Sequence, residues 1–137
     1  MPLLGNDTDG AVTRKRIEAF AAKTEKVTVV AATDAATTQA QATLAAAGHV
    51  VYTMTPTAGR TLTTPTGAEL GAAFTDEAVG TSFKFSVVNL AAATHAVTLT
   101  AGASGVTLSG DAVVAAATSG SFVGVFTAAN TVTIYRV

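Results

Sequence analysis

The sequence predicts a mainly β protein: an antiparallel β-sandwich, or jelly-roll-like domain, with one or two short helices and an extended N-terminal arm. Apolar and polar residues alternate with period two from Thr81 to the C-terminus, as they do along half-buried strands. Turn residues, mainly glycine and asparagine, separate these runs at short intervals. Charged residues make up 12% of the chain, against about 25% in an ordinary soluble domain. A parallel sheet would need crossover helices, and this half of the sequence lacks them.

The length of 137 residues fits one domain with an additional tail, and it is sufficient for a hydrophobic core without a metal or disulfide. We divide the chain into an arm, residues 1–26, and a β-sandwich trimerisation domain, residues 27–137. No cysteine is present, which excludes disulfides and thiolate metal sites.

The arm begins with turn-forming residues at 6–10 and continues into a short predicted helix from Thr13. Ile17, Phe20 and Ala21 share one face of that helix. This apolar face is too small to keep an isolated helix folded, so it needs a partner surface from its own domain or from another chain.

The first half of the β domain reads as strands joined by short helices. Strands are expected at Lys26–Val30, Val50–Thr55 and Arg60–Thr63. Asp34 is expected to cap an alanine-rich helix over residues 35–47 that Gly48 closes. A second helix is expected after Thr64 as N-cap and Pro65 at the first helical position.

The second half carries the period-two pattern. Phe83, Phe85 and Val87 alternate with small polar or charged residues, which predicts one face in the core and one outside. Short V-T-L and V-T-I units recur later, and strand alternation explains them better than a solenoid repeat does.

We find no catalytic or metal-binding motif, and we expect a non-enzymatic protein without a cofactor or metal. His49 and His95 have no second histidine or cysteine at ligand spacing. The fragment at residues 7–10 lacks the further oxygen donors of a calcium loop. A hydrolase site assembled from distant residues remains an open alternative that no motif supports.

The net charge of −1 provides no general attraction to nucleic acid or to an anionic membrane, and neither partner is expected. Residues 112–135 are uncharged, but their many hydroxyl and glycine residues disfavour a membrane-spanning helix. The N-terminus does not read as a secretory signal, so synthesis in the cytoplasm is expected.

The low charge has two interpretations. The outer strand faces of a small β protein can carry threonine instead of charge, or much of the surface can be buried against other chains, where charge is depleted. We favour the second interpretation, and both can hold together.

Several segments, taken as an ordered set, resemble virion proteins of tailed bacteriophages, in particular head decoration (cement) and head-fibre proteins. The resemblance covers roughly residues 50–137. It is carried by residues 58–66, 80–89, 94–100, 119–122 and 132–137. It implies a jelly-roll-like β domain, a homotrimer attached to the outside of an icosahedral capsid, and no catalytic residues.

The leading hypothesis is therefore a capsid decoration protein on the virion surface, made in the host cytoplasm. It would trimerise through the β domain, and its arm would bind the major capsid protein or a neighbouring decoration trimer. Five of the eight basic residues lie in the arm, so we expect the arm to dock on the capsid. The candidate docking residues are Arg14, Lys15, Arg16, Ile17 and Phe20. The alternative is a fibre or tail module that recognises a host glycan, for which Tyr52 and Tyr135 offer the polar aromatic surfaces.

Overall fold

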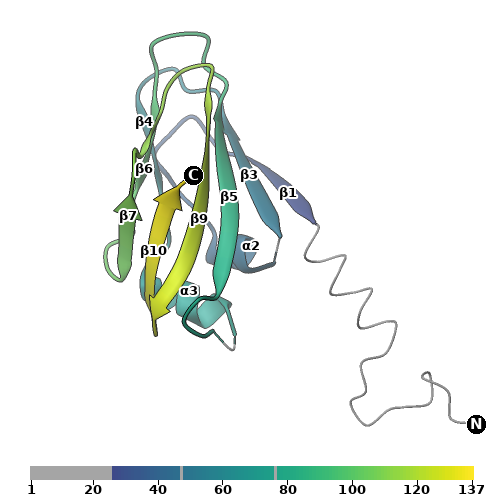
Figure 1. Ribbon diagram of the computed structural model, residues 1–137. Coiled ribbons are helices and arrows are strands. Elements are labelled where there is room, and N and C mark those ends of the chain that lie inside the picture. Colours follow the sequence, from purple (N-terminus) through teal and green to yellow (C-terminus); the bar gives the residue numbers. More distant parts are fainter. Residues whose placement is uncertain (1–25, 47, 76) are drawn as a thin grey trace, which may run out of the picture.

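The computed structural model describes residues 26–46, 48–75 and 77–137, and these form a β-sandwich with two short helices (Figure 1). The strands of the larger sheet are β1 (Val27–Ala31), β3 (His49–Met54), β5 (Ser82–Asn89), β7 (Val106–Ser109), β9 (Ser119–Ala128) and β10 (Thr131–Arg136). Those of the smaller sheet are β2 (Thr37–Thr38), β4 (Arg60–Thr63), β6 (Val97–Thr100) and β8 (Val113–Val114). The helices are α2 (Gln41–Ala46) and α3 (Gly67–Ala73).

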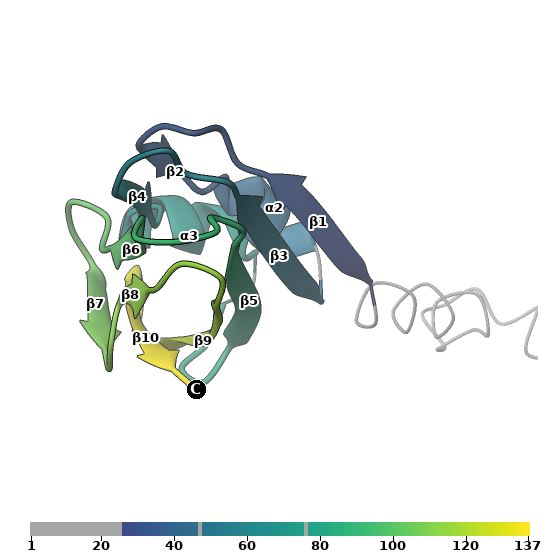
Figure 2. The ribbon, with the colours of Figure 1, turned by 90° about the horizontal axis from the view of Figure 1, so that it is seen from above.

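The two sheets face each other across one core. The larger sheet has the order β1-β3-β5-β9-β10-β7, and the smaller has the order β2-β4-β6-β8. Seen from above, the larger sheet curls from β1 round to β7 and partly encloses β8 (Figure 2). The predicted mainly β sandwich with short helices is confirmed.

The strand directions correct the expected antiparallel pairing in part, because the sandwich contains parallel as well as antiparallel pairs. Five strand pairs of the described part are parallel, namely β1–β3, β3–β5, β2–β4, β4–β6 and β7–β10. Three are antiparallel, namely β5–β9, β9–β10 and β6–β8. Antiparallel pairing holds within the larger sheet only for the long strands of the C-terminal half.

The parallel pairs arise because the chain crosses between sheets before it returns. From β1 it passes to β2 in the other sheet, runs through α2, and comes back beside β1 as β3. β3, β4 and α3 repeat this path and lead to β5. A parallel neighbour needs such a long connection. Here each of the two crossovers contains a strand of the opposite sheet as well as a short helix.

Alternation along the strands builds the core. Phe83, Phe85 and Val87 are all at most 4% exposed, as the period-two pattern predicted. The Phe85 ring has three aromatic neighbours, with ring centroids 5.2 Å from Phe122, 6.2 Å from Tyr52 and 6.3 Å from Phe83. Aromatic pairs at these separations add to the stability that burial alone provides.

The first helix is shorter than expected and begins later. Residues 35–40 do not form a helix: Thr37 and Thr38 instead pair with β4, and Gln39 donates its backbone N–H to the carbonyl of Thr63 at 2.8 Å. Asp34 caps no helix, because its carboxylate accepts hydrogen bonds from Thr57 and Arg60. Pairing with a neighbouring strand outweighed the helix propensity of the alanines.

The second helix begins two residues later than expected, with Thr66 as its N-cap. The Thr66 hydroxyl accepts the backbone N–H of Glu69 at 3.2 Å, and the Glu69 carboxylate accepts the backbone N–H of Thr66 at 2.8 Å. The hydrogen bonds from Thr66 lower the pKa of Glu69, so the carboxylate stays charged in this reciprocal cap. Leu70 is fully buried and holds the helix against the core.

Candidate interaction surface

The residues proposed from the sequence to dock on a capsid lie outside the described residues. Arg14, Lys15, Arg16, Ile17 and Phe20 all precede Lys26, where the described chain begins. Their role stays a prediction. Among the described residues, the two sheets present the broadest surfaces for interaction.

The outward face of the larger sheet is broad and poor in charge. Strand register places small, hydroxyl and β-branched residues side by side across it: Val29 pairs with Val51, Val51 with Ser86, and Ser86 with Ser121. A second row runs from Lys84 through Val123 to Tyr135. We call this the outer face; its strand residues are Val27, Val29, Ala31, His49, Val51, Thr53, Ser82, Lys84, Ser86, Val88, Ser119, Ser121, Val123, Val125, Thr127, Thr131, Thr133, Tyr135, Thr107 and Ser109.

Several apolar side chains of the outer face are open to solvent. Val27 is 58% exposed, Val29 is 65% exposed, and Tyr135 is 42% exposed. Lys84 is the one charged residue that the described strands place on this face. A sheet face with so little charge is unusual for an isolated protein, whose exposed strands commonly carry charge against association.

Charge is concentrated elsewhere, most clearly in an ion pair at the loops. Arg60 Nε lies 2.6 Å from Asp34 Oδ1, and each side chain is about one-third exposed or less, at 29% and 33%. The Arg60 bond first, and then the Thr57 hydroxyl and backbone N–H, hold the pKa of Asp34 well below its ordinary range. The same bond to Asp34 raises the pKa of Arg60. This pair joins the loop after β1 to the start of β4.

A hydrogen-bonded row on the outer face joins a histidine to two serines. His49 Nε2 lies 2.8 Å from the hydroxyl of Ser86, which lies 3.0 Å from the hydroxyl of Ser121. The sequence shows no metal-ligand partner for His49, and it does not indicate this contact with Ser86. Parallel β3–β5 pairing creates it across 37 positions of sequence, and no local motif reports such a register.

This row contains a serine hydroxyl and a histidine, as a nucleophile and its base would be, but among the described residues it has no orienting carboxylate and no oxyanion donors. No described carboxylate bonds to His49, and the row lies on a sheet face instead of in a cleft. Acyl transfer also needs donors aimed at the oxyanion, which an open sheet face with its backbone N–H groups in ladder bonds does not provide. We read the row as polar cross-strand bonding within the outer face.

The described residues also contain no metal-ion cluster and no membrane-spanning helix. His95 is half-buried, and its backbone carbonyl accepts a hydrogen bond from the side chain of Asn89 at 2.8 Å. Residues 26–46, 48–75 and 77–137 contain no group of three or more histidine or acidic residues placed to hold a metal ion. No helix in these ranges is long and apolar enough to cross a membrane.

Comparisons with known proteins give no relative from which a function could be inferred. No protein-family model, curated protein or solved structure matches the chain. The function must therefore be argued from the chain's own residues.

Proposed function

We propose that the protein is a virion structural protein, a capsid decoration protein that trimerises and binds the outer surface of a phage head. The observation that carries this proposal is the outer face of the larger sheet, which presents hydroxyl residues, exposed valines on β1 and a single lysine, Lys84. The resemblance of residues 50–137 to phage decoration and head-fibre proteins supplies the class of assembly.

Burial of the outer face against identical neighbours would be energetically cheap. Burying a charge without a partner costs far more than burying a hydroxyl that finds a hydrogen bond, and the outer face presents almost no charge. Its exposed valines, Val27 and Val29, would contribute apolar area removed from water. A trimer would also match the three-fold and quasi-three-fold positions of an icosahedral shell.

In this role the protein acts mechanically and not chemically. The trimer would lie over the seams between capsomers and add buried interface that resists internal pressure. The arm, residues 1–26, would supply the attachment to the major capsid protein through its basic and apolar residues. Contacts between neighbouring trimers would extend the same reinforcement across the shell.

The trimer is tested by sedimentation velocity on the purified protein and on a charged variant, Val29→Lys. Val29 is 65% exposed on edge strand β1, so a lysine is tolerated in the monomer. In a trimer held by the outer face, we expect it to raise the dissociation constant by about tenfold or more. Val79→Lys is the matched control, since Val79 is 76% exposed and lies on neither sheet. A wild-type monomer at micromolar concentration would refute the trimer.

Capsid attachment is tested separately. Purified protein is mixed with phage heads that lack their decoration protein, and the particles are imaged by electron microscopy. We expect ordered density at three-fold or quasi-three-fold positions. Bare particles at saturating protein would contradict the proposal even if the trimer forms.

The alternative is a glycan-recognising module of a fibre or tail, and Tyr135 is the observation in its favour. Tyr135 is 42% exposed on the outer face, whereas Tyr52 is 3% exposed and points into the protein. One exposed ring on a flat sheet can stack on a sugar, but it makes a poor groove. A glycan array that shows saturable binding, lost in Tyr135→Ala, would favour this alternative.

A further inference from the structure

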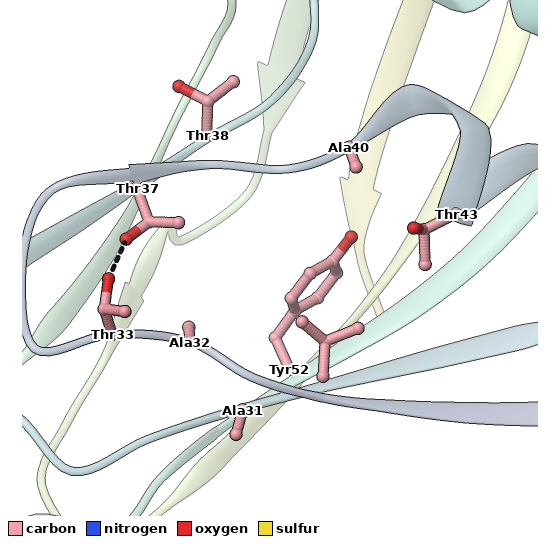
Figure 3. Close-up of a pocket in the computed structure, with 9 residues that line it drawn as sticks. Ala31, Ala32, Thr33, Thr37, Thr38, Ala40, Thr43 and Tyr52 are labelled. Carbon is pink, nitrogen blue, oxygen red and sulfur yellow. Dashed lines mark hydrogen bonds between the residues drawn. The ribbon is translucent and has the colours of Figure 1, made fainter.

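A small apolar pocket opens at the β1 edge of the sandwich, away from the outer face. Its cavity volume is about 190 Å³. Its walls come from the end of β1, the loop into β2, the residues around the start of α2, and one side chain of β3 (Figure 3). The lining residues are Val30, Ala31, Ala32, Thr33, Thr37, Thr38, Ala40, Thr43 and Tyr52.

Tyr52 makes this pocket more than a packing gap. Its side chain rises from β3 between Ala32 and Thr43, and its hydroxyl lies among the lining residues at the closed, buried end of the pocket (Figure 3). The residue is only 3% exposed, and among the described residues its hydroxyl has no hydrogen-bond partner. A buried hydroxyl without a partner is costly, so most such groups in proteins are satisfied by protein, water or ligand.

The walls select for a neutral occupant. Apart from Tyr52, no lining residue has an ionisable side chain. Burial raises the pKa of Tyr52 to about 12, so its hydroxyl is uncharged at neutral pH and can both donate and accept a hydrogen bond. Methyl groups of alanine, valine and threonine form most of the remaining wall, and the hydroxyl of Thr43 faces the same space (Figure 3).

The size of the cavity limits the occupant further. An apolar cavity of about 150 Å³ accommodates benzene, so this pocket accepts a molecule of about six to eight non-hydrogen atoms. A charged molecule would lose its hydration without gaining a counter-charge. A purely apolar molecule would leave the Tyr52 hydroxyl without a partner.

We propose that this pocket binds a small neutral molecule with an apolar body and one hydrogen-bonding group, which Tyr52 recognises through its hydroxyl. Phenol is the simplest probe of this class. The site is independent of the proposed capsid role, because its lining residues other than Ala31 are absent from the outer face.

The test is a titration of the full chain with phenol, followed by methyl-resolved NMR. We expect saturable shifts confined to the pocket methyls, including those of Val30, Ala32 and Ala40, with a dissociation constant in the millimolar range. Benzene should bind more weakly, and benzoate should cause no shifts at the same sites.

Two variants distinguish recognition of the ligand by the Tyr52 hydroxyl from simple occupation of the pocket volume. Tyr52→Phe should weaken phenol binding about fivefold to tenfold and leave benzene binding unchanged, because one hydrogen bond is lost. Ala40→Leu, at an exposed rim position, should reduce binding of both probes. Tyr135→Phe is the matched control and should change neither.

Three results would overturn the proposal. One is the absence of saturable shifts up to about 20 mM phenol, a concentration well above the expected dissociation constant. Another is equal phenol affinity in wild type and Tyr52→Phe. The third is benzoate binding as tight as phenol binding, which would contradict a neutral site.

Discussion

Arg60, the first residue of β4, and Asp34, in the loop after β1, form an ion pair across 26 positions of the sequence: the guanidinium Nε of Arg60 donates to Oδ1 of Asp34 at 2.6 Å. Thr57 donates its hydroxyl to the same carboxylate at 2.5 Å and its backbone N–H at 3.1 Å. One carboxylate thus holds the loop after β1 against the turn before β4, where the chain enters the smaller sheet.

We predict that Asp34→Asn lowers the urea midpoint of unfolding at pH 7. The amide keeps one acceptor but loses the charge that attracts Arg60, and partial exposure keeps the effect modest. Because the pKa of Asp34 is depressed in the folded protein, its stabilisation is complete above the ordinary value of 3.8. It is lost as pH falls through the folded pKa, so the difference between variant and wild type should shrink in acid.

Urea unfolding at several pH values, followed by circular dichroism, measures this difference. Asp111→Asn is the control, because the carboxylate of Asp111 accepts a backbone N–H from Val113 and no described cation bonds to it. A difference between Asp34→Asn and wild type that widens toward low pH would contradict the sign of the shift.

We predict that Gly124→Ala destabilises the fold by about 1–3 kcal/mol, because it overpacks the core. Gly124 pairs with Phe83 across β5 and β9, and a β-carbon on Gly124 would overlap the Phe83 ring. That ring is 4% exposed and lies 5.2 Å, centroid to centroid, from the ring of Phe74, so it has little room to move.

Thermal and urea unfolding check the Gly124 prediction. Gly59→Ala serves as the control, since a β-carbon there meets no atom within 4 Å. We expect Gly59→Ala to be neutral or slightly stabilising through the unfolded state. Equal effects at the two glycines would mean that the Phe83 contact is unimportant.

We predict that Asn89→Ala costs about 2–4 kcal/mol of folding free energy, because it leaves several buried backbone groups without partners. The Asn89 amide donates to the carbonyls of His95 at 2.8 Å and Val114 at 2.9 Å, and its oxygen accepts the N–H of Ala91 at 3.0 Å. These bonds connect the end of β5 to the smaller sheet. The same unfolding assay on Ser82→Ala, an exposed change in the same strand, should give a shift within about 0.5 kcal/mol.

For the arm, we predict that deletion of residues 1–26 abolishes binding to phage heads but leaves the trimer. The described strands and helices all lie after residue 26, so the core remains complete. Co-sedimentation with heads measures binding, and sedimentation velocity measures the trimer. Undiminished binding by the shortened protein would refute the role assigned to Arg14, Lys15, Arg16, Ile17 and Phe20.

Strand positions were predictable from sequence where local alternation dominates. The run from Phe83 to Val87 has its aromatic and aliphatic residues in the core, and β4 has the expected bounds, Arg60–Thr63. Alternation fixes which face of a strand is buried without knowledge of its neighbours. The helix boundaries were less predictable, because Thr37 and Thr38 gain hydrogen bonds from β4 that no local pattern reports.

The candidate sites, like the strands and helices, depend partly on local sequence and partly on long-range pairing. The low content of charged residues was visible in the composition. Strand register, however, decided that uncharged residues gather on the outer face of the larger sheet. The contact of His49 with Ser86 also came from register, and the pocket at Tyr52 came from the way β1, β2 and α2 surround one side chain of β3. Tyr52, one of the two tyrosines that the sequence offers for glycan stacking, is buried and therefore presents no such surface.

By itself the sequence determined the class of the protein: mainly β, with aromatic residues alternating into a core and few charges on its strands. Local periodicity and composition are enough for that, because each strand buries one face whichever strands adjoin it. Only the tertiary structure decided that β1, β3 and β5 run parallel, with each crossover passing through the opposite sheet. That choice depends on long-range pairing and core packing, which join residues that the sequence keeps far apart.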